Sequence, residues 1–183
     1  MASVRSSLQS RQWRRDDYLI TTDSSLIPLA RLIDIFNSKA FYWANAMPLD
    51  YMKATLENSL CFGLFRRHDD DDDDAAGDAF LGLARCITDY TTFLYVTDVW
   101  VDPAAQGRGL GSWVVRCVQE VAEEMPYLRR SVLFTSSWEQ SVPFYRNLMG
   151  MEVVESRFGD GLATMERKGR GHPLYGKQGS DGS

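Results

Sequence analysis

The residues with the clearest chemical potential are three glycines at alternate positions in the stretch QGRGLG, residues 106–111. An apolar segment precedes this stretch, and a long amphipathic pattern follows it. Glycine permits backbone conformations that turn several N–H groups toward one concavity, and the start of a helix adds the positive end of its dipole. A turn of this kind binds anions, phosphate groups above all. We therefore expect an anion site at this glycine turn.

Two side chains of the turn suit such a site, whereas two common nucleotide-binding patterns do not fit it. Arg108 adds positive charge, and Gln106 either braces the turn or donates to a phosphate oxygen. A dinucleotide fingerprint that began at Gly107 would place its third glycine at position 112, which is Ser112, and the acid expected about 20 residues on is missing. No Gly-Lys-Ser or Gly-Lys-Thr follows, so the turn is not a Walker loop.

The period of the apolar residues predicts the elements that position the turn. Spacings of three and four predict helices before Asn37, over 48–59, from Gly111 to Pro126, and over 141–149. Runs typical of strands fall, in chain order, at 60–65, 79–88, 91–101, 132–135, 151–158 and 161–167. The order ααβββ, turn, αβαββ predicts an α/β (α+β) fold, with a mixed, mostly antiparallel sheet flanked by helices.

The domain organisation follows from composition along the chain. We expect one domain over 21–168, after a flexible leader over 1–20 and before a flexible tail over 169–183. A run of like charges repels itself and stays solvated, so residues 66–78 are expected to be a disordered acidic loop between two strands.

These features together resemble the GNAT superfamily of acetyl-CoA-dependent N-acetyltransferases. The pattern QxxGxG, formed by Gln106, Gly109 and Gly111 after the strand end VWVDP, resembles motif A of that superfamily. The segment PFYRNLMGM is similar to the family's FYxxxGF, and the element order from about residue 27 to 167 is similar to the GNAT fold. The resemblance implies an N-acetyltransferase with acetyl-CoA as co-substrate and no metal.

In that family the turn cradles the pyrophosphate of coenzyme A, and the strand before it bonds the pantetheine arm through its backbone. Carried onto this sequence, the resemblance implies coenzyme contacts at Val99, Trp100, Val101, Gln106, Gly107, Arg108, Gly109, Leu110, Gly111 and Ser112.

Acetylation of an amine needs a neutral nucleophile and a protonated leaving thiol, so one acid and one base are sought. Tyr145 matches the family tyrosine near the coenzyme sulfur and is the candidate acid, although its ring could simply pack under the sheet. Asp98 is a carboxylate in an otherwise apolar strand. It is either the base or a structural acceptor that bonds the turn at Asp89 and Tyr90, and many members of the family use a water relay instead.

The acceptor is expected to be a primary amine of a small molecule or a peptide. Phe41, Tyr42 and Trp43 lie between the first two predicted helices, which often border the acceptor pocket in GNAT proteins, and they form either an aromatic wall or part of the core. Aromatic residues and an acidic surface favour a cationic amine. The alternative to an enzyme is a catalytically weak acyl-CoA-binding module that acts as a sensor or scaffold.

Composition argues against several other classes. The formal net charge of −5 comes largely from six consecutive aspartates at 69–74, so the rest of the chain is nearly neutral and lacks the basic stripe of a nucleic-acid binder. Three scattered cysteines and two histidines offer little material for a metal site and suggest buried, reduced thiols. No apolar run is long enough for a membrane span. We expect a cytoplasmic protein, with the nucleus as a second option, and a homodimer is compatible with the sequence.

Overall fold

The computed structural model describes residues 4–38, 47–67, 78–157, 160–168 and 176. The chain divides into two units, one built from Met1–Ile87 and Val96–Val118 and the other from Thr88–Tyr95 and Gln119–Ser183. Each unit has its own part of the sheet. Strand β5 (Phe93–Val101) and helix α4 (Leu110–Glu124) each begin in one unit and end in the other.

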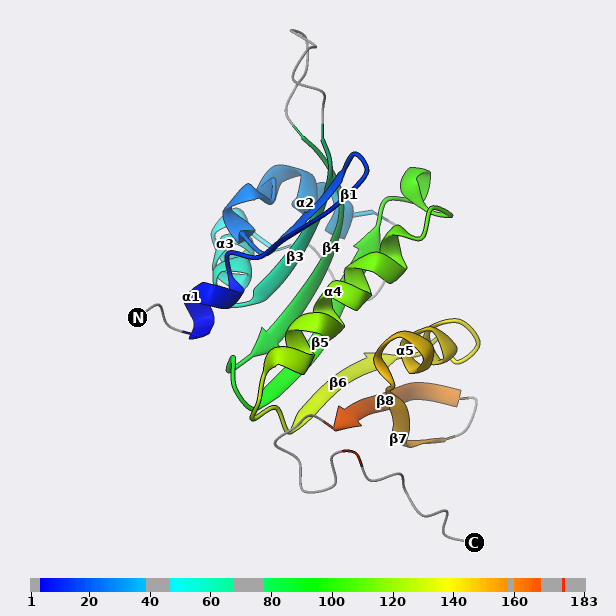
Figure 1. The fold of residues 1–183 in the computed structure, drawn as a ribbon. Coiled ribbons are helices and arrows are strands. Elements are labelled where there is room, and N and C mark those ends of the chain that lie inside the picture. Colours follow the sequence, from blue (N-terminus) through cyan, green and yellow to red (C-terminus); the bar gives the residue numbers. More distant parts are fainter. Residues whose placement is uncertain (1–3, 39–46, 68–77, 158–159, 169–175, 177–183) are drawn as a thin grey trace, which may run out of the picture. The chain divides into compact units, whose positions relative to one another are not determined.

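The first unit opens with an N-terminal segment in which the structure differs from the sequence prediction. Residues predicted as a flexible leader form a short helix, α1 (Val4–Leu8), and a hairpin of strands β1 (Gln12–Arg15) and β2 (Tyr18–Thr21) (Figure 1). The hairpin pairs antiparallel with the next strand, β3 (Leu60–Arg66), from Tyr18↔Arg66 to Thr21↔Gly63. It is held there because Trp13 packs its ring on Phe62, with the ring centroids 5.8 Å apart.

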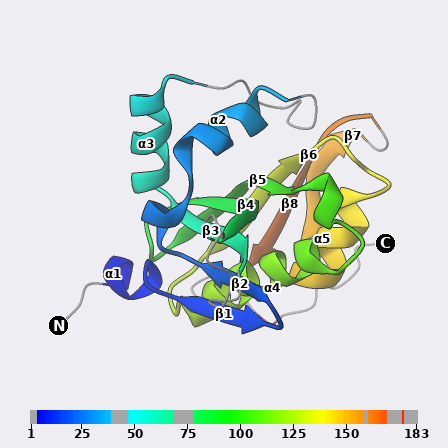
Figure 2. The same cartoon turned by 90° about the horizontal axis from the view of Figure 1, so that it is seen from above.

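The remaining strands of the first unit, β3, β4 and β5, are consecutive neighbours and form a meander, so the strand order in this unit is β1-β2-β3-β4-β5. Strand β4 (Ala79–Thr88) pairs with β3, and the register shifts between Leu64 and Phe65. Helices α2 (Leu29–Phe36) and α3 (Leu49–Glu57) cover one face of these strands, and the start of α4 lies on the other (Figure 2). A short 3-10 turn, η1 (Ser24–Leu26), precedes α2.

Two layers of apolar side chains bury the meander, as the alternation of side chains along a strand requires. On the side of α2 and α3 the core includes Leu32, Met52, Cys61, Phe65 and Trp100. Leucine and phenylalanine side chains that alternate with these along β3 are fully buried, as are the valines of α4.

The second unit contains the first residues of β5, the end of α4, and strands in the order β5-β6-β8-β7. Strand β6 (Arg130–Thr135) runs parallel to β5 and antiparallel to β8 (Asp160–Lys168), which in turn pairs with β7 (Glu152–Arg157). Helix α5 (Ser141–Met149) lies between β6 and β7 in the chain. Pro143 stands in its first turn, where the missing N–H would have no intrahelical partner, so α5 is not interrupted.

The predicted order of helices and strands is confirmed from α2 onward, and so is the mixed α/β fold class. All three cysteines are free and buried, as expected. In the part of the chain that is described, no helix is long and apolar enough to cross a bilayer. The predicted acidic loop (apart from its ends), the tail (apart from residue 176), and Phe41, Tyr42 and Trp43 lie outside the described residues.

Candidate functional site

The glycine turn follows β5 through a short 3-10 helix, η2 (Pro103–Ala105). The Asp102 carboxylate caps η2 by accepting from the N–H of Ala104 at 2.9 Å, while the Asp102 N–H donates to Leu81 O at 2.8 Å. The Gln106 side chain donates from Nε2 to Val101 O at 3.1 Å. Gln106 therefore braces the turn, which is one of the two roles that the sequence left open.

Two of the three glycines are required by backbone conformation. Gly107 has a φ of +79° and Gly109 a φ of +71°, values that L-residues with a side chain avoid. A Cβ atom added at either position would meet no protein atom within 4 Å, so both project toward open space. Gly111 differs, because it lies inside α4 without a positive φ and its Cβ would rest 3.7 Å from Val101.

The first N–H groups of α4 complete the turn. The Trp113 N–H donates to Gly109 O at 3.0 Å, and this is one of the first hydrogen bonds of the helix. The N–H groups that precede Trp113 lie at the helix start, where such groups have no intrahelical acceptor. Open space above two glycines, together with N–H groups at a helix start, is what a pyrophosphate requires. The residues present therefore fit the predicted anion.

Two side chains of the unpredicted hairpin, Arg15 and Tyr18, contact this turn. Arg108 donates from Nη1 to the Tyr18 hydroxyl at 3.0 Å, and Arg15 donates from Nη2 to Arg108 O at 3.4 Å. The Arg15 guanidinium also lies over the Trp113 ring, 4.6 Å from its centroid. The sequence held a signal for the hairpin: hydrophobic residues such as Trp13 and Leu19 flank the polar pair Asp16 and Asp17.

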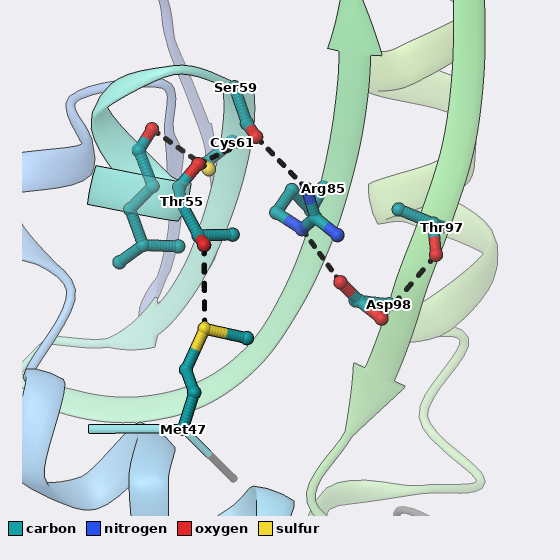
Figure 3. Close-up of polar contacts among 8 residues, drawn as sticks. Met47, Thr55, Ser59, Cys61, Arg85, Thr97 and Asp98 are labelled. Atoms are coloured by element: carbon teal, nitrogen blue, oxygen red, sulfur yellow. Dashed lines mark hydrogen bonds and ion pairs between the residues drawn. The ribbon is translucent and has the colours of Figure 1, made fainter. Parts of the chain in front are cut away.

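Asp98 lies in β5 and is only 7% exposed. Its φ of +49° is left-handed, which marks an irregularity in the strand. Its Oδ2 accepts from Arg85 Nε at 2.6 Å, and its Oδ1 accepts from the Thr97 hydroxyl at 3.4 Å. Figure 3 shows the Arg85 side chain reaching from β4 toward the Asp98 carboxylate on β5.

Arg85 extends this network to α3 and to the residue that precedes β3. Its Nη1 donates to Ser59 Oγ at 3.1 Å, and the Ser59 hydroxyl donates to Thr55 O at 2.7 Å (Figure 3). Asp98 is therefore braced against β4. The turn that the sequence offered as its alternative partner is held by Asp89, whose carboxylate accepts from backbone N–H groups of the next residues.

The neighbouring thiol of Cys61 is not a nucleophile candidate. Burial raises its pKa to about 12; the positive charge of Arg85 opposes this rise, and the negative charge of Asp98 reinforces it. A thiol with such a pKa stays protonated near neutral pH and is unreactive.

The residues predicted to contact the pantetheine arm lie at the end of β5. Trp100 and Val101 are buried and Val99 is half-buried. Among the described residues, Trp100 Nε1 is a buried donor with no hydrogen-bond partner. Val101 O already accepts from Gln106, so this carbonyl is committed to the turn.

Tyr145 lies on α5 in the second unit, whereas Asp98 and the glycine turn lie in the first. Its half-buried ring meets Phe144 edge-on, at 5.1 Å between centroids and an interplanar angle of 86°. Across the described part of the chain, no cluster of three or more His, Cys, Asp and Glu side chains could hold a metal ion.

Comparison with known proteins places these features in a family context. Residues 29–151 match the family described as "Acetyltransferase (GNAT) family". A predicted acetyltransferase of Gibberella zeae is 34% identical over 134 residues, which cover 69% of this chain and 76% of that protein.

Solved structures agree with this match. One is a crystal structure of a protein from Xanthomonas campestris pv. campestris that is assigned to the GNAT family. It is 28% identical to this chain with a TM-score of 0.57, and the match covers 77% of this chain and 92% of that protein's chain. The spermidine N-acetyltransferase of Vibrio cholerae, solved with CoA and spermine, shares the fold with a TM-score of 0.59 at 13% identity, over 84% of this chain and 96% of its own.

Proposed function

Because this chain belongs to the acetyltransferase (GNAT) family, we propose that it transfers the acetyl group of acetyl-CoA to a primary amine of a small molecule or peptide. The attack is direct, within a ternary complex of protein, acetyl-CoA and amine. The observation that carries the proposal is the pair Gly107 and Gly109, whose positive φ angles leave open space beside the start of α4.

Acetyl-CoA supplies the acetyl group as an activated thioester. The backbone of residues 106–112 binds its pyrophosphate, and Arg108 adds a positive charge beside it. The end of β5 binds the pantetheine arm, for which the unpartnered Nε1 of Trp100 is an additional buried donor. An unsatisfied buried donor costs about 1–3 kcal/mol, so a ligand oxygen at this position would remove a penalty that the free protein carries.

Two side chains handle protons in the proposal. The Tyr145 hydroxyl donates a proton to the departing sulfur, because a phenol can do so without carrying charge in the ground state. Asp98 accepts a proton from the amine, while Arg85 Nε donates to its Oδ2 at 2.6 Å. Arg85 thereby fixes the orientation of the carboxylate toward the amine.

A cationic amine such as a polyamine is the acceptor class that we favour. The net charge of −5 attracts cations weakly, and residues 41–43, which lie outside the described residues, would offer cation–π contacts if they form the aromatic wall that the sequence allows.

The proposal is tested by two measurements on the full chain. Calorimetry with acetyl-CoA measures binding. A thiol assay measures free CoA released with a panel of polyamines, amino acids, arylamines and lysine peptides, against a control without acceptor that corrects for the protein's own cysteines. Binding with CoA release for at least one amine supports the proposal. Binding without release for every amine favours a sensor or scaffold module, and an absence of binding contradicts both.

A further inference from the structure

The N-terminal hairpin carries a row of side chains to the end of the sheet where the glycine turn lies. Arg15 and Tyr18 are paired directly across the hairpin, beside its tip, and Tyr18 is paired with Arg66 of β3. Residues directly opposite each other in antiparallel strands project from the same face of the sheet. Arg15, Tyr18 and Arg66 therefore form one row on one face.

Three side-chain contacts connect this row to the turn. The Tyr18 hydroxyl accepts from Arg108 Nη1 at 3.0 Å, which fixes the guanidinium of the turn's own arginine. Arg15 donates to Arg108 O at 3.4 Å and lies 4.6 Å above the Trp113 ring in the first turn of α4. An arginine stacked on an aromatic ring keeps its edge N–H groups available for a further acceptor.

The charges of this row are not neutralised within the described protein. Arg31, Arg85, Arg130 and Arg167 each form an ion pair with a carboxylate. Among the described residues, no carboxylate pairs with Arg15, Arg66 or Arg108. Arg15 and Arg108 therefore meet beside a turn that presents backbone N–H groups, with no carboxylate partner among the described residues, and Arg66 stands in the same row through its pairing with Tyr18.

We propose that Arg15, Arg66 and Arg108 form a cationic rim that binds phosphate groups of coenzyme A, and that Tyr18 is a positioning residue that holds Arg108 toward them. This inference rests on the proposed use of acetyl-CoA. It assigns a binding role to the hairpin, which precedes the matched family region at residues 29–151. Guanidinium groups suit phosphate oxygens because their planar N–H groups form paired, charge-assisted hydrogen bonds.

The rim is tested by calorimetry with CoA and with dephospho-CoA, which lacks the 3′-phosphate. Arg15→Ala should weaken CoA binding by about 10-fold, the range of one partly exposed charge-assisted contact. Arg14→Ala is the matched control, because it removes the same charge from the neighbouring residue, which is exposed and projects from the opposite face. A loss limited to CoA places Arg15 at the 3′-phosphate, and an equal loss for both ligands places it at the pyrophosphate.

Equal affinity of wild type and Arg15→Ala for both ligands would overturn the inference, as would an equal loss in Arg14→Ala. A wild type that binds neither ligand would instead contradict the proposed function itself. Because Arg15→Ala could loosen the hairpin, a second test uses Tyr18→Phe, which keeps the ring. It should weaken CoA binding about 3-fold, and this loss should vanish in an Arg108→Ala background. Additive losses would show that Tyr18 does not act through Arg108.

Discussion

The glycine turn and the candidate proton-transfer residues are built in opposite ways. The turn is made of main chain: two glycines with positive φ, a braced carbonyl and the start of a helix, all within a few consecutive residues. The proton-transfer candidates are single side chains, Asp98 on β5 and Tyr145 on α5, whose orientation depends on distant parts of the sequence. A main-chain site should therefore be sensitive to backbone geometry, whereas a side-chain site should be sensitive to the loss of one atom.

Tyr145→Phe has the largest expected effect on turnover and tests the side-chain part of this comparison. The variant keeps the ring and its edge contact with Phe144 but removes the donated proton. We expect kcat to fall by about 10²-fold while coenzyme affinity and folding are retained. Steady-state kinetics beside calorimetry check this. Wild-type turnover across the pH range would refute the acid role, and the hydroxyls of Ser136 and Ser137, which directly follow β6, would be the next candidates.

Asp98→Asn tests whether Asp98 acts as a catalytic base or only as the structural partner of Arg85. The substitution leaves the Arg85 guanidinium facing a neutral partner in a largely buried site, so we expect a loss of about 2 kcal/mol in the free energy of unfolding. If Asp98 also accepts the proton of the amine, the deficit in kcat/KM should shrink as pH rises toward the pKa of the acceptor, because more of the amine is then already neutral. A deficit that is independent of pH would leave Asp98 with the bracing role alone. Denaturant unfolding and a pH–rate profile give the two readouts.

Gly109→Val tests the main-chain side of the comparison. A β-branched residue is strained at a φ of +71°, and its side chain would enter the open space assigned to phosphate. Coenzyme affinity should fall by at least about 10-fold. Gly111→Ala is the matched control, because its φ is not positive and its Cβ would make an ordinary contact with Val101 at 3.7 Å. Calorimetry that finds equal affinities for both variants would refute the assignment of the turn.

Asp89 combines main-chain and side-chain features, since its carboxylate holds a main-chain turn. Burial alone would raise the pKa of Asp89, but hydrogen bonds from the Thr92 hydroxyl and from the N–H groups of Thr92, Thr91 and Phe93 together lower it well below its usual value. A lowered pKa in the folded state stabilises the protein above the pKa of the unfolded state, about 3.9, and this stabilisation is lost as pH falls further.

Asp89→Asn should therefore cost stability at pH 7, by no more than about 1 kcal/mol because the carboxylate is exposed and screened. The difference from wild type should narrow as pH falls below about 3.9. Unfolding curves at neutral and acidic pH check this, and a difference that grows at low pH would contradict it.

Local sequence determined much of this protein. The positions of α2, α3, α4 and α5 and the strands from β3 onward followed from apolar periodicity, Pro126 and turn residues, because these signals act within a few residues of the chain. The glycine turn was readable for the same reason, since its conformation depends on φ at Gly107 and Gly109. The sequence suggested a special backbone conformation at all three glycines, but Gly111 has ordinary helical geometry.

Tertiary structure alone decided which side chains meet. The hairpin was missed because its strands are four residues each and are stabilised by pairing with β3 and by Trp13 on Phe62, contacts that link residues far apart in the chain. Arg85 and Arg15 carried no signal in the sequence, because neither belongs to a local motif. Their partners are set by strand register: Arg85 meets Asp98 across adjacent strands, and Arg15 reaches Trp113 only after the hairpin has joined the sheet.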